Sequence, residues 1–400
     1  MSSRVAVVLL SFVNLSAFAG AAESGSAIAT PAGEAAPAVV DVVLNFAATD
    51  GTPLEAKLSI PSGATVPVPV VFHLHGAGPR NFDHAMRYLN ADGQRVTGRY
   101  YDYYAHELAR RGLAFFRMSK RGCTSEVPSG RPLVDRTVFS ATTPNLLLDD
   151  YAQALDALRR RPEIDARRVV LSGASEGTIL APELARRSPE GIVGLALCGY
   201  AADNMRDIVV WQNTVGPWRN VQRMIPAAAD GTLTKEEHAA AVEKKPTLAT
   251  VLPFAPLDTN GDGVVTDSEL AAVVRPRLDA TLKAVEERND EFIWQAVLNL
   301  TSAYLRERWE GEPNHATLIK LDVPIAIFHG ELDGACRVEG VRETEAAFRA
   351  AGKTNLVVHV YPDHDHDLNW TWETLKDGGP VPFKDAFEFM AGLLRPVGGG

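Results

Sequence analysis

Ser175 is the residue best suited to nucleophilic chemistry in this chain. It is the centre of Gly173-Ala174-Ser175-Glu176-Gly177, which follows the apolar residues 169–171 and precedes a helical pattern. A nucleophilic serine in Gly-x-Ser-x-Gly sits on a sharp strand-to-helix turn that lifts its hydroxyl clear of the sheet. The flanking glycines permit that turn, because larger residues would clash there. Since the pattern also arises by chance in chains with many Gly and Ser, it predicts a nucleophile only together with suitable partners.

An upstream segment is suited to stabilising a negatively charged intermediate. Residues 67–74 form a strand pattern with prolines only at its start, where a strand tolerates them, and lead into His75-Gly76-Ala77-Gly78-Pro79. Hydrolases with a Gly-x-Ser-x-Gly turn hold the tetrahedral intermediate with two backbone N–H groups, one after the nucleophile and one from such a loop. We expect these oxyanion donors to be Ala77 and Glu176. The alternative is an ordinary Gly-Pro turn at the end of a strand.

A carboxylate is expected after the serine in the chain, just beyond a core strand. Residues 323–330 have the pattern of a buried strand and end in Glu331-Leu332-Asp333-Gly334. Asp333 lies where the acid of a Ser-His-Asp triad is expected. Glu331 is the alternative acid.

A histidine is expected last, after one more strand. Residues 356–361 form that strand pattern and lead into Pro362-Asp363-His364-Asp365-His366-Asp367, which offers two candidate bases. We choose His366, with His364 as the alternative. The predicted chemistry is two-step acyl transfer, in which His366 takes the Ser175 proton and Asp333 orients the imidazole.

Other histidines and two tryptophans have competing interpretations. The alternating His and Asp of residues 362–367 also suit a transition metal or a solvated loop, but no further ligands stand nearby at matching spacing. His73 and His329 precede glycine-bearing turns and are interpreted as structural histidines. Trp370 and Trp372 are candidates for the wall of a substrate pocket, with buried packing as the alternative.

These motifs resemble those of bacterial α/β-hydrolase esterases, whose oxyanion turn reads His-Gly-Ser-Gly-Pro and whose elbow reads Gly-His-Ser-Glu-Gly. Serine aminopeptidases are close relatives of that family. The resemblance extends over residues 112–125, with Arg117, Lys120 and Arg121-Gly122, and over residues 149–165 before the elbow strand. It implies an α/β fold with a mostly parallel, twisted sheet and helices on both faces.

The resemblance also orders the candidate substrates. It implies a carboxylic ester first and a peptide or amide bond second, with no cofactor for the chemistry. The chain departs from the family pattern at Ala77, which replaces a serine, at Ala174, which replaces a histidine, and at residues 334–337. These departures concern the pocket rather than the triad. A noncatalytic calcium-binding protein on a hydrolase scaffold is the alternative from another class.

A second motif, residues 258–269, satisfies the EF-hand pattern at every ligand position. The predicted oxygen ligands of a calcium ion are Asp258, Asn260, Asp262, the Val264 carbonyl, Thr266 and Glu269. Gly263 at the sixth position permits the sharp turn that such a loop makes. The sequence therefore predicts a calcium site with a structural role.

Residues 226–237 match only the second half of such a loop. Its first and third positions fall on Pro226 and Ala228, which offer no carboxylate, so we expect weak calcium binding or none. We expect this loop to pair Leu233 with Val265.

A small helical unit should surround the two loops, with helices such as 235–243 and 267–287. It lies between strand patterns at residues 191–198 and 323–328, which is where the hydrolases of the resemblance carry lids. We expect a helical cap over residues 201–320, inserted between core halves 39–200 and 321–397.

The N-terminus has the pattern of an export signal. Arg4 precedes the apolar residues 5–13 and then small residues, with cleavage expected after Ala19 or Ala21. We therefore expect a signal peptide at residues 1–21, a flexible leader at 22–38, and a periplasmic or secreted protein without a membrane span in its mature form. An uncleaved span is the weaker alternative, because the apolar segment is short.

Composition limits the remaining function classes. The chain has 400 residues and a formal net charge of −10, which argues against nucleic acid as a partner. Its three cysteines are too few for a disulfide scaffold. Cys198 ends a strand pattern and is expected in the core, while Cys123 and Cys336 lie on predicted loops as the pair open to bridging. The oligomeric state stays open.

Overall fold

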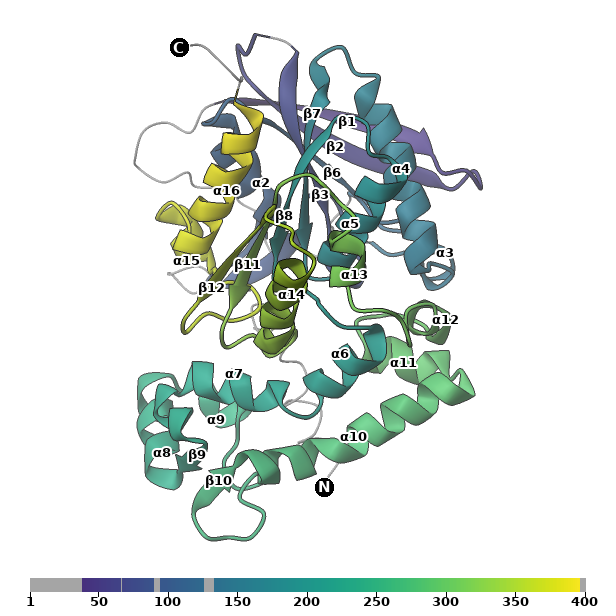
Figure 1. The fold of residues 1–400 in the computed structure, drawn as a ribbon. Helices are drawn as coiled ribbons and strands as arrows, with labels where there is room; N and C mark the ends of the chain where they lie inside the picture. The colour runs from purple at the N-terminus through teal and green to yellow at the C-terminus, as the bar shows by residue number, and fades with distance from the viewer. Residues whose placement is uncertain (1–37, 66, 90–93, 126–132, 396–400) are drawn as a thin grey trace.

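The computed structural model describes residues 38–395, except residue 66, residues 90–93 and residues 126–132. The predicted signal peptide and all of the predicted leader except Ala38 lie outside the described residues. An eight-stranded sheet forms the centre of the larger part of the molecule (Figure 1). In spatial order its strands are β1 (Val39–Ala47), β2 (Pro53–Pro61), β6 (Ala114–Met118), β3 (Val68–Leu74), β7 (Ile164–Ala174), β8 (Ile192–Cys198), β11 (Ile325–Gly330) and β12 (Leu356–Tyr361).

The sheet is mostly parallel. β2 pairs antiparallel with β1 and β6, and every later neighbouring pair, from β6 and β3 to β11 and β12, is parallel. Parallel strands are buried on both faces and therefore read as mostly apolar runs. β3 is buried over all seven of its residues, and His73 is its one polar residue. This confirms the α/β architecture predicted from the sequence.

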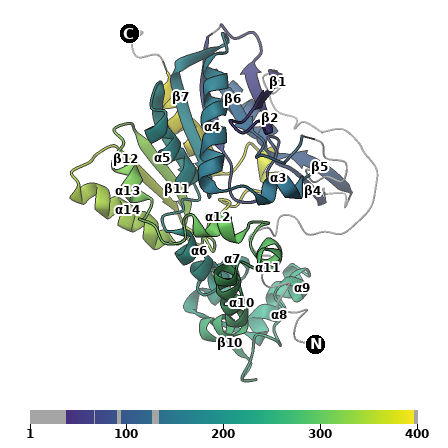
Figure 2. The same cartoon turned by 90° about the vertical axis from the view of Figure 1, so that its right-hand side faces the viewer.

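Helices cover both faces of the sheet (Figures 1 and 2). Because successive side chains of a strand point to opposite faces, Val70 and Phe72 join one apolar core and Val71 joins the other. The first core is completed by α4 (Pro144–Arg159), α5 (Gly177–Arg187) and α14 (Val338–Ala350), and the second by α2 (Tyr100–Ala109) and α16 (Val381–Leu394). The remaining elements of this part are α3 (Arg136–Ser140), α15 (Trp372–Lys376) and the hairpin of β4 (Ala85–Leu89) and β5 (Arg95–Arg99).

A helical region is inserted between β8 and β11, and it lies below the sheet in the view of Figure 1. Its helices are α6 (Met205–Gln212), α7 (Gly216–Met224), the 3-10 helix η2 (Pro226–Asp230), α8 (Lys235–Lys244), α9 (Leu248–Val251), α10 (Asp267–Glu287), α11 (Asp290–Ala296), α12 (Ser302–Arg306) and α13 (His315–Leu318). Part of the insertion has an apolar core of its own around Trp218, Leu233 and Val265. The C-terminal half of α10 instead joins the core of the sheet through Ala284 and Val285.

Two short strands tie the insertion's loops together. β9 (Thr232–Thr234) pairs antiparallel with β10 (Val264–Thr266), and this register confirms the predicted pairing of Leu233 with Val265. Each strand ends in a threonine that caps the next helix in a capping box, Thr234 with Glu237 and Thr266 with Glu269. The two loops therefore start α8 and α10 from one small sheet.

The pairing left open for Cys123 and Cys336 is not formed, since Cys123, Cys198 and Cys336 are all free thiols. Cys123 lies beyond the end of β6, whereas Cys336 follows β11. Three strands separate β6 from β11 in the sheet, so the two loops are about 19 Å apart at a spacing of about 4.8 Å per strand. A disulfide requires Cα atoms within about 7 Å.

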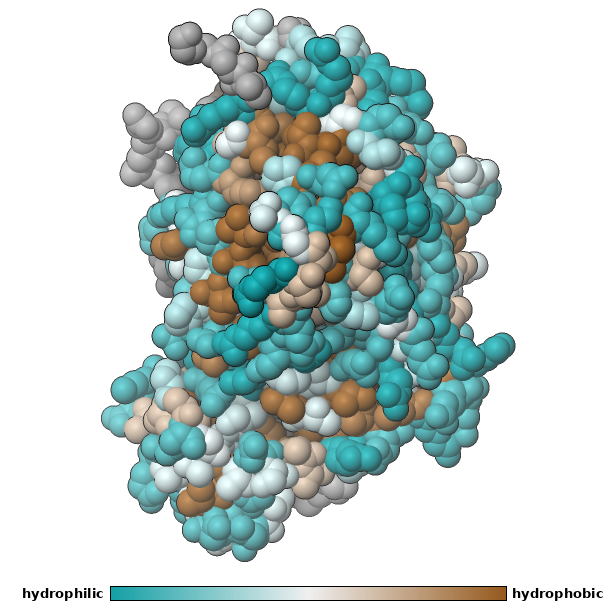
Figure 3. All heavy atoms as spheres, in the orientation of Figure 1, coloured by the Kyte–Doolittle hydropathy of each residue, from teal (hydrophilic) through white to brown (hydrophobic). Residues whose placement is uncertain are grey.

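Apolar side chains reach the surface over the sheet and its edge strand β12 on the face seen in Figure 3. Val357 in β12 and Val381 at the start of α16 are among the exposed large hydrophobic residues of the described chain. Among the described residues, none of the helices combines the length and apolar character that a membrane crossing requires.

Candidate active site

Ser175 occupies a strained turn between β7 and α5. Its φ is +54°, a left-handed value that costs a non-glycine residue of the order of 1–3 kcal/mol. Its N–H donates to the Cys198 carbonyl at the end of β8 (2.9 Å). A Cβ at Gly173 would lie 2.4 Å from the Gly177 carbonyl oxygen, and one at Gly177 would lie 2.1 Å from the Leu74 carbonyl oxygen. The two glycines are therefore required by close backbone contacts, and not only by chain flexibility.

The loop after β3 lies directly against the serine. A Cβ at Gly76 would be 3.2 Å from the Cβ and 3.8 Å from the Oγ of Ser175. Among the described residues, the backbone N–H groups of Ala77 and Glu176 have no hydrogen-bond acceptor. Two unpaired N–H groups beside a serine hydroxyl are what an oxyanion hole requires.

Asp333 and His366 are joined by a hydrogen bond of 2.8 Å between Oδ2 and Nδ1. The other carboxylate oxygen of Asp333 accepts the N–H groups of Ala335 (2.7 Å) and Cys336 (2.8 Å). Burial alone would raise the pKa of Asp333, but the neighbouring His366 and His329 outweigh it and lower that pKa. Asp333 is therefore held as an anion that accepts from the imidazole.

His366 is the histidine that the structure brings to Asp333. Burial lowers the pKa of its ring, but Asp333, followed by Asp367 and Asp365, outweighs burial and raises the pKa to about 9. His364 instead bonds the Pro362 carbonyl through Nδ1 (2.7 Å).

The alternative acid lies elsewhere. Glu331 pairs with Arg342 at 3.4 Å, so it is not the partner of the imidazole.

The His366 ring and Ser175 both lie against the end of β8. A Cβ at Gly199 would lie 3.1 Å from the His366 ring, while the preceding residue, Cys198, accepts the Ser175 N–H. The oxyanion loop, the serine, the acid and the histidine loop follow the carboxyl ends of β3, β7, β11 and β12, so all four lie at one end of the parallel strands. Ligand sites of open α/β sheets lie at this end of the strands.

The Glu176 side chain has a role that the sequence did not indicate. It is buried and accepts hydrogen bonds from Lys120 Nζ (2.8 Å) and from the Tyr304 hydroxyl. Lys120 also donates to the carbonyl of Gly76 (2.7 Å). One buried ammonium therefore joins the elbow to the oxyanion loop. Lys120 belonged to a recognised motif, but no local pattern marked Tyr304.

The insertion touches each of the loops that carry a predicted catalytic residue. Tyr304 of α12 reaches Glu176 in the elbow. A Cβ at Gly78 would lie 2.9 Å from the Leu298 carbonyl oxygen, so the segment after α11 packs on the oxyanion loop. Near the N-terminus of α7, a Cβ at Gly216 would lie 2.1 Å from the carbonyl oxygen of Gly334, next to Asp333.

The histidine loop is contacted as well. Arg223 of α7 forms an ion pair with Asp365 (3.3 Å), the residue before His366.

Other residues singled out in the sequence have structural partners. His73 bonds Tyr101 (2.7 Å) and Ser172 (3.2 Å), and His329 bonds the Cys336 carbonyl (3.2 Å). Both tryptophans pack on other aromatic rings. Trp372 stacks on Tyr88 with ring centroids 4.4 Å apart, and Trp370 lies tilted against Tyr100 with centroids 4.5 Å apart. These contacts agree with the packing interpretation of both tryptophans.

The predicted calcium loop has the turn that the motif requires. Gly263 has a φ of +86°, and its N–H donates to Asp258 (3.1 Å). The Glu269 carboxylate, at the last ligand position, reaches back to the N–H of Thr259 (2.9 Å). The other predicted ligands on this loop and its strand are Asn260, Asp262, Val264 and Thr266.

The loop carboxylates bind backbone N–H groups and are not gathered around one point. In the described part of the chain, only Asp333, Cys336 and His366 place three potential ligand atoms of His, Cys, Asp or Glu within 4.8 Å of one another. Asp333 and His366 already bond each other there.

The Lys120–Glu176 pair generates a stability prediction. Both side chains are buried, so Lys120→Met strands a carboxylate, and we expect a loss of about 3–5 kcal/mol in the free energy of unfolding. Adding Glu176→Gln removes the stranded charge and should recover part of that loss. Urea unfolding followed by circular dichroism measures both. A double variant no more stable than Lys120→Met would contradict the pairing.

Comparison with known proteins gives a partial match. No protein-family model matches the chain. Esterase EstD of Thermotoga maritima is 26% identical over 174 residues, which span 43% of this chain and 37% of that esterase. The chain thus matches well under two thirds of that relative's length.

The solved structures that resemble the chain do so at low sequence identity and with TM-scores below 0.5. A thermostable carboxyl esterase from Bacillus coagulans is 15% identical, with a TM-score of 0.48 over 89% of this chain and 99% of that one. The α/β hydrolase GrgF from a Penicillium species is 13% identical, with a TM-score of 0.48 over 89% and 99% of the two chains. The order of the sheet, the strained serine between β7 and α5 and the match to Esterase EstD together support an α/β-hydrolase fold for this chain.

Proposed function

We propose that this protein is a serine hydrolase that cleaves carboxylic esters, with Ser175 as nucleophile, His366 as base and Asp333 as the residue that orients the base. The observation that carries the proposal is the 2.8 Å bond between His366 and Asp333 at the sheet edge that also holds the strained serine. The similarity to Esterase EstD favours an ester as substrate.

The proposed reaction has two steps. His366 Nε2 takes the Ser175 proton as Oγ attacks the ester carbonyl, and the N–H groups of Ala77 and Glu176 hold the oxyanion. His366 then gives the proton to the leaving alcohol, which leaves an acyl-serine. Water attacks this ester with His366 again as base, and the acid is released. Asp333 stabilises the imidazolium in both steps.

Burial of Glu176 favours esters over peptides. An aminopeptidase needs an acceptor for the substrate's terminal ammonium group, and a carboxylate beside the nucleophile would serve. The Glu176 carboxylate instead accepts from Lys120 and Tyr304. A peptide or amide hydrolase is therefore placed second, and a noncatalytic calcium-binding protein third.

Replacement of the nucleophile tests the proposal. Ser175→Ala should lower kcat for p-nitrophenyl acetate, butyrate and octanoate by about 10⁴-fold or more, without loss of folded structure by circular dichroism. An aminoacyl p-nitroanilide is the parallel substrate. Cleavage of the anilide alone would favour the peptidase. No detectable turnover of any of these substrates would favour the binding protein. Full ester turnover by Ser175→Ala would exclude the serine mechanism.

The raised pKa of His366 predicts the pH dependence. The base must be neutral to accept a proton, so kcat/KM should rise with pH through the neutral range and level off above about 9. Asp367→Asn removes a carboxylate that stabilises the imidazolium. The rising part of the pH profile of kcat/KM should therefore lie at lower pH in Asp367→Asn than in the wild type. An unchanged profile would mean that Asp367 does not act on the base.

We further propose that residues 258–269 bind calcium. The left-handed Gly263, the return of Glu269 to the start of the loop and the β9–β10 pair support this proposal. Oxygen ligands suit this hard cation, whose coordination geometry is flexible. Bound calcium would replace the backbone N–H groups as the partner of the loop carboxylates.

The proposed role of calcium is to stabilise the insertion as a cap over the active site. The loop starts α10, and α10 joins both the insertion's core and the core of the sheet. We propose export of the protein, on the apolar N-terminal segment described above. Calcium outside the cytosol would keep an ordinary site filled, which favours a structural role over a switch.

Calcium titration tests this role with a matched pair of variants. At a free calcium concentration of roughly 100 times Kd, binding should stabilise the folded protein by about 3 kcal/mol, read as a rise in Tm. Glu269→Gln should abolish the rise. Glu237→Gln is the control, because it removes the equivalent capping-box residue from the incomplete loop. An equal rise in the wild type and Glu269→Gln would place calcium elsewhere.

A further inference from the structure

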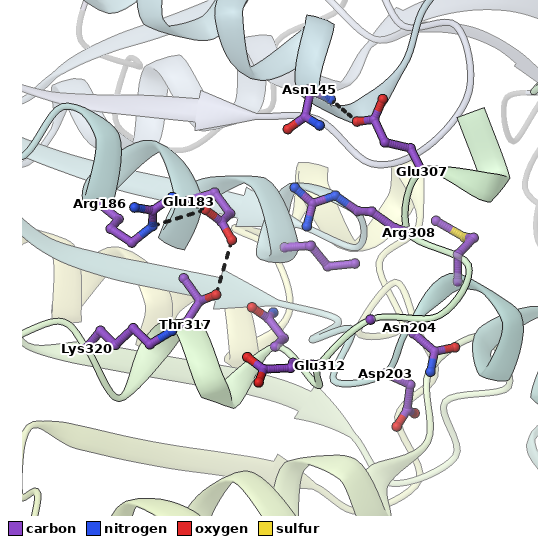
Figure 4. A pocket seen from close by; sticks show the side chains of 14 residues that line it. Asn145, Glu183, Arg186, Asp203, Asn204, Glu307, Arg308, Glu312, Thr317 and Lys320 are labelled. Carbon is purple, nitrogen blue, oxygen red and sulfur yellow. Dashed lines mark hydrogen bonds and ion pairs between the residues drawn. The ribbon is translucent and has the colours of Figure 1, made fainter. Parts of the chain in front are cut away.

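A polar cavity of about 490 Å³ lies where the insertion joins the core (Figure 4). Its lining comes from α5, from residues 203–205 that lead into the insertion, and from residues 307–320 that lead out of it. The two connections bond each other beside the cavity, since the Met205 N–H donates to the Arg308 carbonyl (2.9 Å). A molecule bound here would contact the core and both connections at once.

Most of the acidic groups around the cavity already have partners. Asp203 accepts two hydrogen bonds from Arg337 (2.7 and 2.8 Å). Glu183 accepts from Arg186 (3.2 Å) and Thr317 (3.1 Å).

The remaining acids lie on the outgoing connection. Glu307 accepts the N–H of Asn145. Glu312 is exposed to solvent, as is the lining cation Lys320.

Among the cations of the described lining, Arg308 is the one that is half-buried, whereas Arg186 and Lys320 are exposed. The Nε of Arg308 is buried without a hydrogen-bond acceptor, and among the described residues no carboxylate forms an ion pair with its guanidinium. In Figure 4 its side chain extends across the pocket toward α5, with no dashed line to any lining residue. Guanidinium groups at such positions are normally paired, because an unpaired buried N–H is costly.

We propose that this cavity binds a small oxyanion, a carboxylate or a phosphate, on the Arg308 guanidinium. The planar fork of N–H groups matches two oxygens of such an anion and would satisfy the orphaned Nε. Lys320, on the rim, adds a second positive charge. Two of the four acids of the lining already have partners, since Arg337 binds Asp203 while Arg186 and Thr317 bind Glu183.

The position of Arg308 connects this cavity to the elbow. Tyr304, four residues earlier, donates its hydroxyl hydrogen bond to Glu176, the neighbour of Ser175. An anion on Arg308 would therefore fix the segment that carries Tyr304. The bound anion holds the insertion to the core at its two connections.

Isothermal titration of the full chain with inorganic phosphate, and separately with succinate, tests the site. We expect one anion to bind per chain. Anion concentrations up to about 10 mM cover the range needed to detect a Kd near 1 mM. Arg308→Gln should weaken anion binding at least about tenfold. Arg308→Lys keeps the positive charge but loses the planar pair of N–H groups, so its affinity should lie between those of the wild type and Arg308→Gln. Binding of phosphate alone would identify phosphate as the ligand class, and binding of succinate alone a carboxylate.

Arg206→Gln is the matched control, because Arg206 is exposed on α6 outside the cavity and forms an ion pair with its neighbour Asp207 (3.9 Å). It should bind the anion as the wild type does. Absence of binding of either anion to the wild type would overturn the proposal, as would equal binding by Arg308→Gln. Ser175→Ala should keep the site, so a failure of the hydrolase assignment leaves this proposal standing.

Discussion

The close contact between the start of α5 and the end of β3 determines the rest of the site. A Cβ at Gly177 would lie 2.1 Å from the Leu74 carbonyl oxygen, so only a glycine allows the helix to begin there. The oxyanion loop begins at the residue after Leu74, and Ser175 lies two residues before Gly177. A single backbone contact thus places Ser175 against the loop that carries Ala77. The left-handed φ of Ser175 is the local cost, and the packed sheet offsets it.

The buried ammonium group of Lys120 also stabilises the contact between the elbow and the oxyanion loop. Lys120 bonds Glu176 and the Gly76 carbonyl, so it links the two segments that would otherwise meet only through van der Waals contact. A buried ion pair contributes little net stability when it is complete, because desolvation offsets the attraction. Its value here is geometric, since losing either partner strands a charge beside the nucleophile. Asp333 follows the same logic, with three donors that compensate its burial.

The sequence predicted the elements that are encoded locally. The elbow around Ser175, the β9–β10 register and the bounds of α10 at Asp267 and Glu287 all follow from short patterns of glycine, apolar and capping residues. It also singled out Asp333 and His366, because each follows a recognisable strand. It did not predict the bond from Tyr304 to Glu176, whose residues are 128 positions apart with no pattern to join them. The suggested meeting of Cys123 and Cys336 was wrong for the related reason that loop position says nothing about strand order.

The insertion explains why such long-range contacts matter. It meets the elbow through Tyr304, the oxyanion loop through Leu298 and the histidine loop through Arg223. Its own apolar core around Trp218 is small, and a small core supplies little stability by itself. Any device that stiffens the insertion, whether a metal in its loop or a ligand at its connections, therefore acts on three catalytic loops together. The geometry of the site depends as much on this attached region as on the sheet that carries the triad.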